Sequence, residues 1–356
     1  MEFLFIKGDT VRNVRLSKFI ACLSKMGHDV SFWGWDRSSL SQGDERLRDC
    51  RYLFRGGGFG HKVMLYYPLW MVKLFFTVLL SNYSRGKKIV AVNFDAALPV
   101  AIAACIRRDK FIYEIRDEFA LSYKFPGIIK RMIKAIDHWI IRRSEFVIHV
   151  DANRITYDKG KYVVIENSPE DYWHGCQRDY DKVERVIAVI GNLSWGRGIE
   201  SISTFAEKNP AFKILVVGTY YDDRTKSRLD NLRNVIHKER MPQQELFKEM
   251  ECCCAIFSLY DPALEINRLA ASNKVYDAMM MGIPVVTNRE VVNAKSIADE
   301  GVGLVVDYEY NDTWRNLEQD DFLEVVKRMG QKGRRLYLEK YQFDKMIADR
   351  FIPMVE

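Results

Sequence analysis

Short apolar runs alternate along the whole chain with longer segments in which apolar residues recur every three or four positions. In the first half, the short runs predict strands at residues 3–6, 30–35, 89–93, 111–115, 146–150 and 162–165. The longer segments predict helices at about residues 11–26, 63–80, 97–105 and 127–143. This order is typical of a sheet built from βαβ units.

The second half repeats the alternation. It predicts strands at residues 186–190, 212–217, 235–236, 254–259, 283–287 and 302–306, with helices at 199–207, 222–232, 242–250, 273–281 and 322–339. We therefore predict the α/β class, with two doubly wound, Rossmann-like domains facing a cleft. Residues 166–169, Glu-Asn-Ser-Pro, have the composition of a linker. The N-terminal domain is thus expected at 1–166 and the C-terminal domain at 167–339, with the helix 340–356 packing back on the first.

Residues 260–288, YDPALEINRLAASNKVYDAMMMGIPVVTN, form a polar loop, a short helix and a strand. Ser272 or Asn273 can cap this helix, and Gly282 ends it. Lys274 and Asp277 then lie near the carboxyl edge of the sheet, beside the free N–H groups of the first helical turn. A cation and a carboxylate there favour a clamp for a phosphate and a ribose diol. The alternative is a surface ion pair on an ordinary helix.

A glycine-rich loop, GNLSWGRG at residues 191–198, joins the first strand of the second domain to its helix. Its amides and Arg197 favour contact with a phosphate. The spacing is close to that of a Walker loop, but Arg197 replaces the lysine and Gly198 replaces the Mg²⁺-binding hydroxyl residue. An NTPase is therefore disfavoured, and a tight turn without a ligand is the alternative. The first βαβ unit also lacks G-x-G-x-x-G, so it is no dinucleotide fingerprint.

Charge is distributed unevenly. Residues 1–165 carry 28 Lys and Arg against 16 Asp and Glu, whereas the remainder is acidic, which suggests an anionic partner for the first half. Arg12 and Arg15 begin the first helix, where acidic residues are preferred. We expect one of them to face a cleft and meet an anion there; exposed arginines are the alternative.

Two helices in the first half bear on membranes. Residues 63–80 reach the minimum length of a membrane span, but Pro68 and Lys73 interrupt them, which favours a packed helix that can touch a bilayer. The helix 127–143 has an apolar face and a basic face, which is typical of helices on anionic membrane surfaces. A core-facing helix with a solvated side is the alternative.

Seven cysteines without a CxxC pair indicate a reduced, intracellular protein without a metal cluster, and the N-terminus lacks the pattern of a signal peptide. No Ser/His/Asp triad or HExxH motif is present. Nucleic-acid binding is not expected, because the basic residues are scattered and no recognised module occurs.

Several segments in this order carry a family resemblance: KIVAVNFDAALPVAIAACI, KFIYEIRDEFA, VIENSPE, GNLSWGRGIE, FKILVVG, YDPALEINRLAASNK and SNKVYDAMMMGIPVVTN. With them, nearly the whole chain resembles the bacterial GT-B glycosyltransferases, and within these a family-4-type enzyme of cell-surface polysaccharide synthesis. The resemblance implies transfer of a sugar from a nucleotide-sugar to a glycan or polyprenyl-diphosphate-linked acceptor. It implies no cofactor and no metal, since the nucleotide-sugar is a substrate, and a UDP-sugar is favoured over a GDP-sugar. We expect a cytoplasmic protein, peripheral on the anionic inner face of the cytoplasmic membrane.

The resemblance also implies site residues. The expected donor-binding residues are Gly191, Asn192, Gly196, Arg197, Gly198, Gly218, Glu265, Asn267, Ser272, Asn273, Lys274 and Asp277. The expected acceptor-binding residues are Gly8, Arg12, Asn93, Asp95 and Arg116. The chain departs from the family where Asp277 replaces a glutamate and Leu269 replaces another, so Glu265 or Asn267 is expected to contact the donor sugar. Asn192 stands where an arginine is common, and Asn93 and Arg116 stand where histidines are common.

The expected reaction retains the configuration of the sugar, with the leaving phosphate taking the acceptor's proton. An inverting enzyme is a competing hypothesis and needs a carboxylate base, for which Asp117 or Glu118 is the candidate. Two further hypotheses are a sugar-nucleotide 2-epimerase and a non-catalytic, membrane-associated scaffold.

Overall fold

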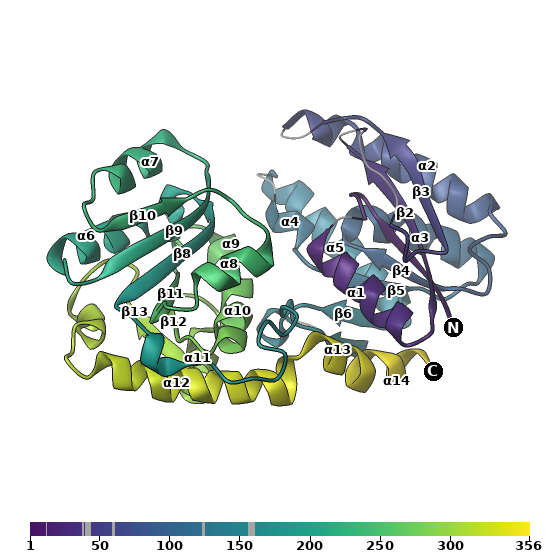
Figure 1. The fold of residues 1–356 in the computed structure, drawn as a ribbon. Helices are drawn as coiled ribbons and strands as arrows, with labels where there is room; N and C mark the ends of the chain where they lie inside the picture. Colours follow the sequence, from purple (N-terminus) through teal and green to yellow (C-terminus); the bar gives the residue numbers. More distant parts are fainter. Residues whose placement is uncertain (12, 38, 40–43, 59–60, 123–124, 156–160) are drawn as a thin grey trace. The chain divides into compact units, whose positions relative to one another are not determined.

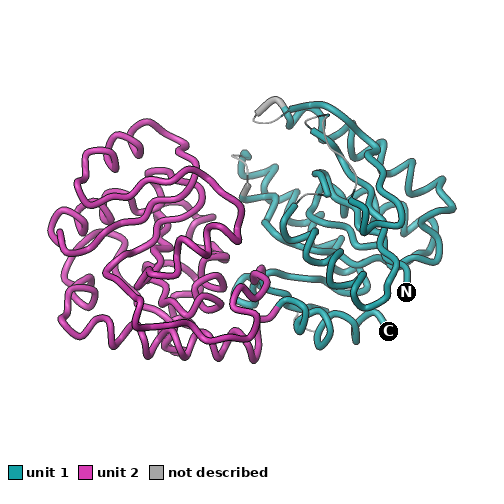
Figure 2. The backbone as a smooth tube through the Cα atoms, in the orientation of Figure 1, with its two compact units in different colours: residues 1–166, 343–356 teal, residues 167–342 magenta. Residues whose placement is uncertain are grey.

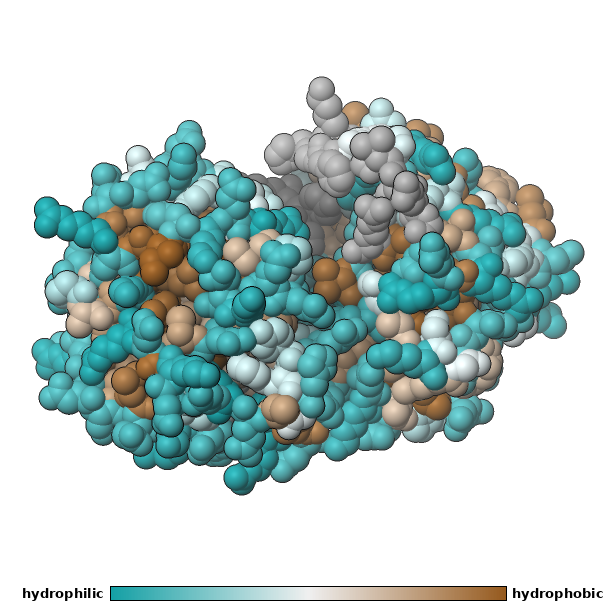
Figure 3. Space-filling model, in the orientation of Figure 1, coloured by the Kyte–Doolittle hydropathy of each residue, from teal (hydrophilic) through white to brown (hydrophobic). Residues whose placement is uncertain are grey.

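A computed structural model describes residues 1–11, 13–37, 39, 44–58, 61–122, 125–155 and 161–356. The chain forms two compact units, each with its own sheet. Unit 1 comprises Met1–Glu166 and Phe343–Glu356, and unit 2 comprises Asn167–Gln342 (Figure 2). Figure 3 shows a largely hydrophilic surface interrupted by hydrophobic groups of side chains.

Unit 1 is built on a seven-stranded parallel sheet in the order β3-β2-β1-β4-β5-β6-β7 (Figure 1). Its strands are β1 Glu2–Lys7, β2 Asp29–Asp36, β3 Asp49–Arg55, β4 Lys88–Val92, β5 Ile112–Ile115, β6 Val147–His149 and β7 Tyr162–Val164. Its helices are α1 Val14–Lys25, α2 Tyr67–Leu80, α3 Phe94–Arg107, α4 Phe119–Ser122 and α5 Gly127–Arg143, followed at the end of the chain by α13 Phe343–Met346 and α14 Ile352–Val355.

Strand β1 shows why helices cover both faces of this sheet. Successive side chains of a strand point to opposite faces. Leu4 and Ile6 belong to the core that α2, α3 and α5 complete. Phe5 packs on Phe19 of α1, at 5.7 Å between ring centroids, and Phe3 packs on Phe351, also at 5.7 Å. The segment from Phe343 onwards therefore forms part of the unit 1 core.

Unit 2 has a six-stranded parallel sheet in the order β10-β9-β8-β11-β12-β13. Its strands are β8 Val186–Leu193, β9 Lys213–Tyr220, β10 Val235–Lys238, β11 Ala255–Ser258, β12 Val285–Asn288 and β13 Gly303–Val306. Its helices are α6 Ile199–Lys208, α7 Asp223–Asp230, α8 Gln243–Glu249, α9 Glu265–Arg268, α10 Asn273–Met281, α11 Ala294–Glu300 and α12 Phe322–Leu336. The two parallel sheets with alternating helices confirm the predicted pair of doubly wound domains.

Several elements differ from the sequence prediction. Helices α4, α9 and α11 were not predicted, and α3 begins at Phe94, three residues before its predicted start. The strand β3 was not predicted, and it is a half-buried edge strand without a clear apolar alternation. Helix α1 begins at Val14 because the Asn13 side chain accepts a hydrogen bond from the Leu16 amide, at 3.4 Å, and so caps it. Helix α12 ends at Leu336 and continues into wider turns.

Each sheet has one point where the strand order reverses: between β1 and β4 in unit 1, and between β8 and β11 in unit 2. Ligands of doubly wound sheets bind outside the carboxyl ends of the strands at such points. The loops after these four strands are therefore the places to look for functional side chains.

Candidate functional site

The glycine loop follows β8 at the unit 2 switch point. Its Trp195 amide donates to the Asp222 carboxylate at 3.1 Å, and the Asp261 amide donates to the Gly196 carbonyl at 2.9 Å. Gly198 has φ +74°, and a Cβ there would lie 2.6 Å from Leu259. Only glycine fits this position, where the loop turns into α6 against the end of β11.

Two cations of the predicted donor set lie beside one aromatic ring. The Arg197 guanidinium carbon is 4.2 Å from the centroid of Tyr260, and the Lys274 ammonium is 5.8 Å from the same centroid. Both cations are half-buried. Arg197 Nη1 is buried and has no hydrogen-bond partner in the described part of the chain. An N–H donor in this state is available to an anionic ligand.

The electrostatics of this cluster are positive. The pKa of Lys274 lies below its ordinary value, because burial lowers it and the positive charge of Arg197 lowers it further. Tyr260 and Asp277 raise this pKa, but by less. Burial raises the pKa of Tyr260, but the charges of Lys274 and Arg197 outweigh it and leave that pKa below its ordinary value. A bound phosphate would relieve the repulsion between the two cations.

Sequence reasoning missed Tyr260 and the residue that holds it. The Tyr260 amide donates to Asn288 Oδ1 at 2.9 Å, and Asn288 Nδ2 donates to the Tyr260 carbonyl at 3.1 Å. Asn288 is fully buried at the end of β12. Each of the two residues directly follows a predicted strand. Their position at the carboxyl ends of strands was the sequence signal that could have identified them as candidate site residues.

The N-terminus of α10 faces the same region. Ser272 occupies the N-cap position, but its hydroxyl accepts a hydrogen bond from Ser258 at 2.8 Å and caps no helical amide. Asn273 is exposed at the first position of the helix. Asp277, one turn further on, is buried and accepts from Gln243 Nε2 at 3.4 Å. The helix therefore presents amides and Lys274 at its start, with the carboxylate of Asp277 behind them.

The remaining predicted donor residues have varied surroundings. Gly191 and Asn192 are exposed at the end of β8. A Cβ at Gly218 would lie 1.9 Å from the Gly191 carbonyl, so close strand contact accounts for this glycine. Asn267 Nδ2 donates to the Asp261 carbonyl at 3.0 Å, whereas Glu265 is exposed at the start of α9. Of these two side chains, Glu265 is therefore the more accessible to a donor sugar.

The switch point of unit 1 carries a cavity of about 240 Å³. Its lining residues are Lys7, Gly8, Asp9, Arg37, Tyr67, Asn93, Asp95, Asp117 and Phe119. Asn93, between β4 and α3, has φ +63°, a backbone conformation that costs energy in any residue with a side chain. Such strain is concentrated at functional sites, and Asn93 is one of the predicted acceptor residues.

Asp95 is the most deeply buried carboxylate of this cavity. Its Oδ2 accepts from Trp70 Nε1 at 3.1 Å, and a Cβ on Gly8 would lie 2.0 Å from the same oxygen. Burial raises the pKa of Asp95 to about 6, although Arg37 and Lys7 act in the opposite direction. Asp95 therefore changes its charge near neutral pH within a cavity.

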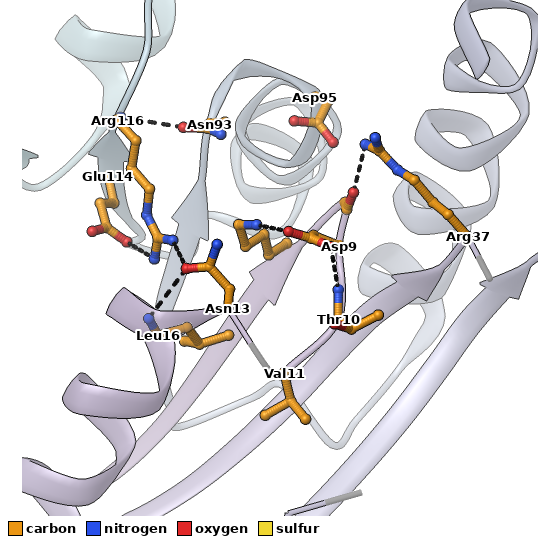
Figure 4. A network of polar contacts seen from close by, with 12 residues as sticks. Asp9, Thr10, Val11, Asn13, Leu16, Arg37, Asn93, Asp95, Glu114 and Arg116 are labelled. Atoms are coloured by element: carbon orange, nitrogen blue, oxygen red, sulfur yellow. Dashed lines mark hydrogen bonds and ion pairs between the residues drawn. The ribbon is translucent and has the colours of Figure 1, made fainter. Parts of the chain in front are cut away.

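A buried ion network lies beside the cavity (Figure 4). Glu114 accepts from Arg15 Nε at 2.6 Å and from Arg116 Nη2 at 2.9 Å. Burial raises the pKa of Glu114, but the two guanidinium groups outweigh it and lower that pKa to about 2. Arg15 is buried against Glu114 of its own unit, so the alternative of an exposed arginine is wrong for it, but Arg15 is not among the residues that line the cavity. The guanidinium of Arg116 is bound to Glu114 and Asn13, and this predicted acceptor residue does not line the cavity.

Three other predicted residues complete unit 1. Asp117 lines the cavity, is largely exposed and lies 3.8 Å from Arg154 Nη1. Glu118 is half-buried and is not among the lining residues. Arg12 lies outside the described residues. Among the residues that the structure describes, no three His, Cys, Asp or Glu side chains come together as metal ligands.

No family model matches the chain, and no curated protein matches its sequence. Solved structures match along nearly all of it. The chain is similar to the sucrose-phosphate synthase of Thermosynechococcus elongatus, with TM-score 0.70 and 13% identity over 98% of this chain and 96% of that one. It is similar to a glycosyltransferase from Rickettsia africae ESF-5, with TM-score 0.66 and 14% identity over 99% and 97%. It is also similar to the UDP-GlcNAc 2-epimerase of Neisseria meningitidis bound to UDP-GlcNAc, with TM-score 0.60 and 12% identity over 100% and 99%. At such identities the likeness establishes the fold alone.

Proposed function

We propose that this chain, which has the GT-B fold, is a glycosyltransferase that moves a sugar from a nucleotide-sugar to a glycan or polyprenyl-diphosphate-linked acceptor. One observation carries the proposal: Arg197, with a buried N–H that has no partner among the described residues, and Lys274 lie beside Tyr260 at the switch point of unit 2. Two cations next to helix and loop amides suit a diphosphate. Glycosyltransferases among the similar structures support the same class of reaction.

The chemistry follows from the charges that develop. When the bond between the sugar and the phosphate breaks, its electron pair stays on the nucleotide diphosphate, which becomes more negative. Arg197 and Lys274 stabilise this charge, and the amides at the start of α10 add to it. In a retaining reaction, the acceptor hydroxyl attacks from the side of the departing phosphate, which takes the proton. Protein groups at this site are then sufficient for departure of the leaving group, and we propose a metal-independent reaction.

Thermal stability in the presence of ligands tests donor binding. UDP, GDP, ADP, CMP and dTDP, each alone and as nucleotide-sugars, would be compared for the increase in Tm that they cause. We expect nucleotides of one base to raise Tm more than the others, with UDP favoured. We expect this increase in Tm to disappear in Arg197→Ala. An equal response of wild type and variant to every nucleotide would contradict the proposed diphosphate site.

The acceptor and location are proposed from unit 1. A cavity with carboxylates, an amide and the rings of Tyr67 and Phe119 suits sugar hydroxyls and the apolar face of a sugar. We propose a role in surface polysaccharide synthesis at the inner face of the cytoplasmic membrane, where lipid-linked acceptors are available. Radiolabelled transfer to polyprenyl-diphosphate-linked sugars would detect this activity, and transfer to water-soluble glycans alone would contradict the lipid-linked acceptor.

An inverting reaction is the second candidate, and one observation favours it. Asp117, a candidate base from the sequence, lines the unit 1 cavity, whereas Glu118 does not. The anomeric configuration of the product, read by NMR, separates the two reactions.

A 2-epimerase is tested by incubating the enzyme with UDP-GlcNAc alone, since an epimerase needs no acceptor. Non-catalytic scaffolding predicts no nucleotide affinity at all.

A further inference from the structure

Helix α2 has two apolar faces, and only one of them is packed. Trp70, Leu74 and Val78 recur every four residues and are buried in the unit 1 core. A second row also follows helical spacing, beginning at Leu65 in the 3-10 turn just before α2, and each of its members is more than half exposed: Leu65, Leu69, Val72, Phe76 and Leu80. Single exposed apolar residues are ordinary, but a continuous row of this length marks an interaction site.

The neighbouring helix extends this surface. Helix α3 packs along α2, and its Ile102 and Ile106 are exposed. We define the α2–α3 face as the seven exposed residues Leu65, Leu69, Val72, Phe76, Leu80, Ile102 and Ile106. Figure 3 shows hydrophobic side chains at the surface in the region of α2. Within the described residues, one helical segment, Val63–Leu80, is long and apolar enough to cross a membrane, and only 22% of it is buried. A core helix is mostly buried, so packing does not account for its composition.

The charges around the face are mostly positive. Lys73 is exposed on α2, and the one acidic residue of α2 and α3, Asp95, is buried. Basic residues lie directly beyond the two helices, at Arg85, Lys88, Arg108 and Lys110. Lys110 pairs with Glu145 at 3.2 Å, and Asp109, which pairs with Arg107, lies among them. Helix α5, which packs on α3, adds exposed Arg131, Arg142 and Arg143 and the exposed apolar residues Ile128 and Met132. An apolar surface bordered by cations complements an anionic lipid surface.

The geometry excludes a membrane-spanning role for α2. The fourteen residues of α2 alone give a helix of about 21 Å, short of the roughly 30 Å hydrocarbon core, and the apolar segment reaches the minimum length of a span only with the 3-10 turn before α2. Trp70, Leu74 and Val78 are also held in the core of unit 1. A helix fixed along one side in this way can only lie in the plane of the bilayer surface.

We propose that the α2–α3 face docks unit 1 on an anionic lipid bilayer, with the exposed row of α2 in the headgroup and acyl boundary. From sequence, residues 63–80 were expected as a packed helix that can touch a bilayer. The basic helix 127–143 was a second candidate for membrane contact, with a core-facing helix as the alternative. The structure assigns the apolar contact to α2 and α3, with α5 supplying charge at the border. The purpose of docking rests on the proposed function, since it would bring the enzyme to a lipid-linked acceptor.

Vesicle co-flotation of the full chain tests the proposal. Wild type, Leu69→Ser/Phe76→Ser and two control variants would be mixed with phosphatidylglycerol-containing vesicles and with pure phosphatidylcholine vesicles, at low and high salt. The controls Tyr221→Ser and Met354→Ser replace exposed apolar residues of unit 2 and of the C-terminal segment. We expect wild type and controls to bind anionic vesicles and to lose binding at high salt, and the double variant to bind at least about tenfold more weakly.

Three outcomes would overturn the proposal. The first is equal binding of wild type to both kinds of vesicle, and the second is unchanged binding of the double variant. The third is that light scattering shows a dimer for wild type and a monomer for the double variant. The last result would make the face a contact between two copies of the chain. Circular dichroism checks that the double variant is folded, and the nucleotide-induced rise in Tm checks its donor site. Because this rise reports on unit 2 alone, failure of docking and failure of the proposed transferase function remain distinguishable.

Discussion

Tyr260 shows how single residues define the candidate donor site. Its ring lies beside Arg197 and Lys274, and its backbone is held at both the amide and the carbonyl by Asn288. Neither Tyr260 nor Asn288 was predicted as functional, because the hydrogen bonds that join them cross 28 positions of sequence. Arg197 and Lys274 were predicted, since each follows a local signal: a glycine loop and a helix start.

Removing Arg197 tests the diphosphate clamp directly. We expect Arg197→Ala to lower kcat/KM by an amount equal to about 2–4 kcal/mol of transition-state stabilisation, as the loss of a charged donor does. Arg197→Lys keeps a positive charge and should recover part of the loss. Arg185→Ala is the matched control, because Arg185 also lies over an aromatic ring, Phe212, at 5.2 Å. Steady-state kinetics with the donor identified by thermal shift measure all three, and full turnover of Arg197→Ala would refute the clamp.

Asn288 should act through the position of Tyr260. Asn288→Leu leaves the buried amide and carbonyl of Tyr260 without these partners, which costs about 1–3 kcal/mol for each unsatisfied group. We expect a lower urea midpoint and weaker nucleotide binding together. A variant with normal stability and normal nucleotide affinity would show that Asn288 does not position the ring.

Asp95 links stability to pH. Its folded-state pKa of about 6 lies above the ordinary aspartate value, so the folded state binds the extra proton between about pH 4 and 6. Stability from this group is therefore present at low pH and lost as pH rises through 6, by up to about 3 kcal/mol.

Asp95→Asn tests this directly. Asparagine keeps an acceptor for Trp70 Nε1, so the variant should be more stable than wild type at pH 8, and by a smaller margin at pH 5. Urea unfolding at both pH values measures this. If Asp95 also binds the acceptor, the same variant should show reduced transfer. Equal stability of wild type and variant at pH 8 would contradict the inference that the ionised Asp95 carboxylate destabilises the folded state.

At the scale of elements, the segment from Phe343 to Val355 belongs to a sheet formed by residues far earlier in the chain. Phe351 contacts Phe3, Phe19 and Phe146, with ring centroids 5.7, 5.8 and 6.2 Å apart. We expect Phe351→Ala to destabilise unit 1 by about 3–5 kcal/mol through a buried cavity. Hydrogen exchange would locate the loss of protection in unit 1. Met354→Ala, at a more exposed position of the same segment, should have little effect.

Elements with strong periodicity were predictable, and edge elements were not. The bounds of α5 were predicted correctly, because apolar and basic residues separate cleanly along it. The strand β3 was missed, because its residues are half-buried at the edge of the sheet and therefore show no clear alternation of apolar and polar side chains. For α2, composition alone predicts a long apolar helix, but only the structure separates its packed row from its exposed row.

At the scale of the whole molecule, both units follow one plan. Each parallel sheet reverses its strand order once, and each reversal carries predicted site residues: Gly8 and Asn93 in unit 1, and the glycine loop with Lys274 in unit 2. The order of strands and helices along the chain was enough to predict this plan. The burial of Asp95 depends on the packing of α3 against Trp70 of α2, and the buried network of Glu114 depends on Arg15 of α1. Periodicity encodes neither contact.

The division of unit 1 into two pieces of sequence has a consequence for biosynthesis. Residues 343–356 emerge from the ribosome only after all of unit 2 has been made. Unit 2, continuous in sequence, can complete its sheet during translation, while the nascent unit 1 still exposes Phe3 and Phe19 on the uncovered side of its sheet.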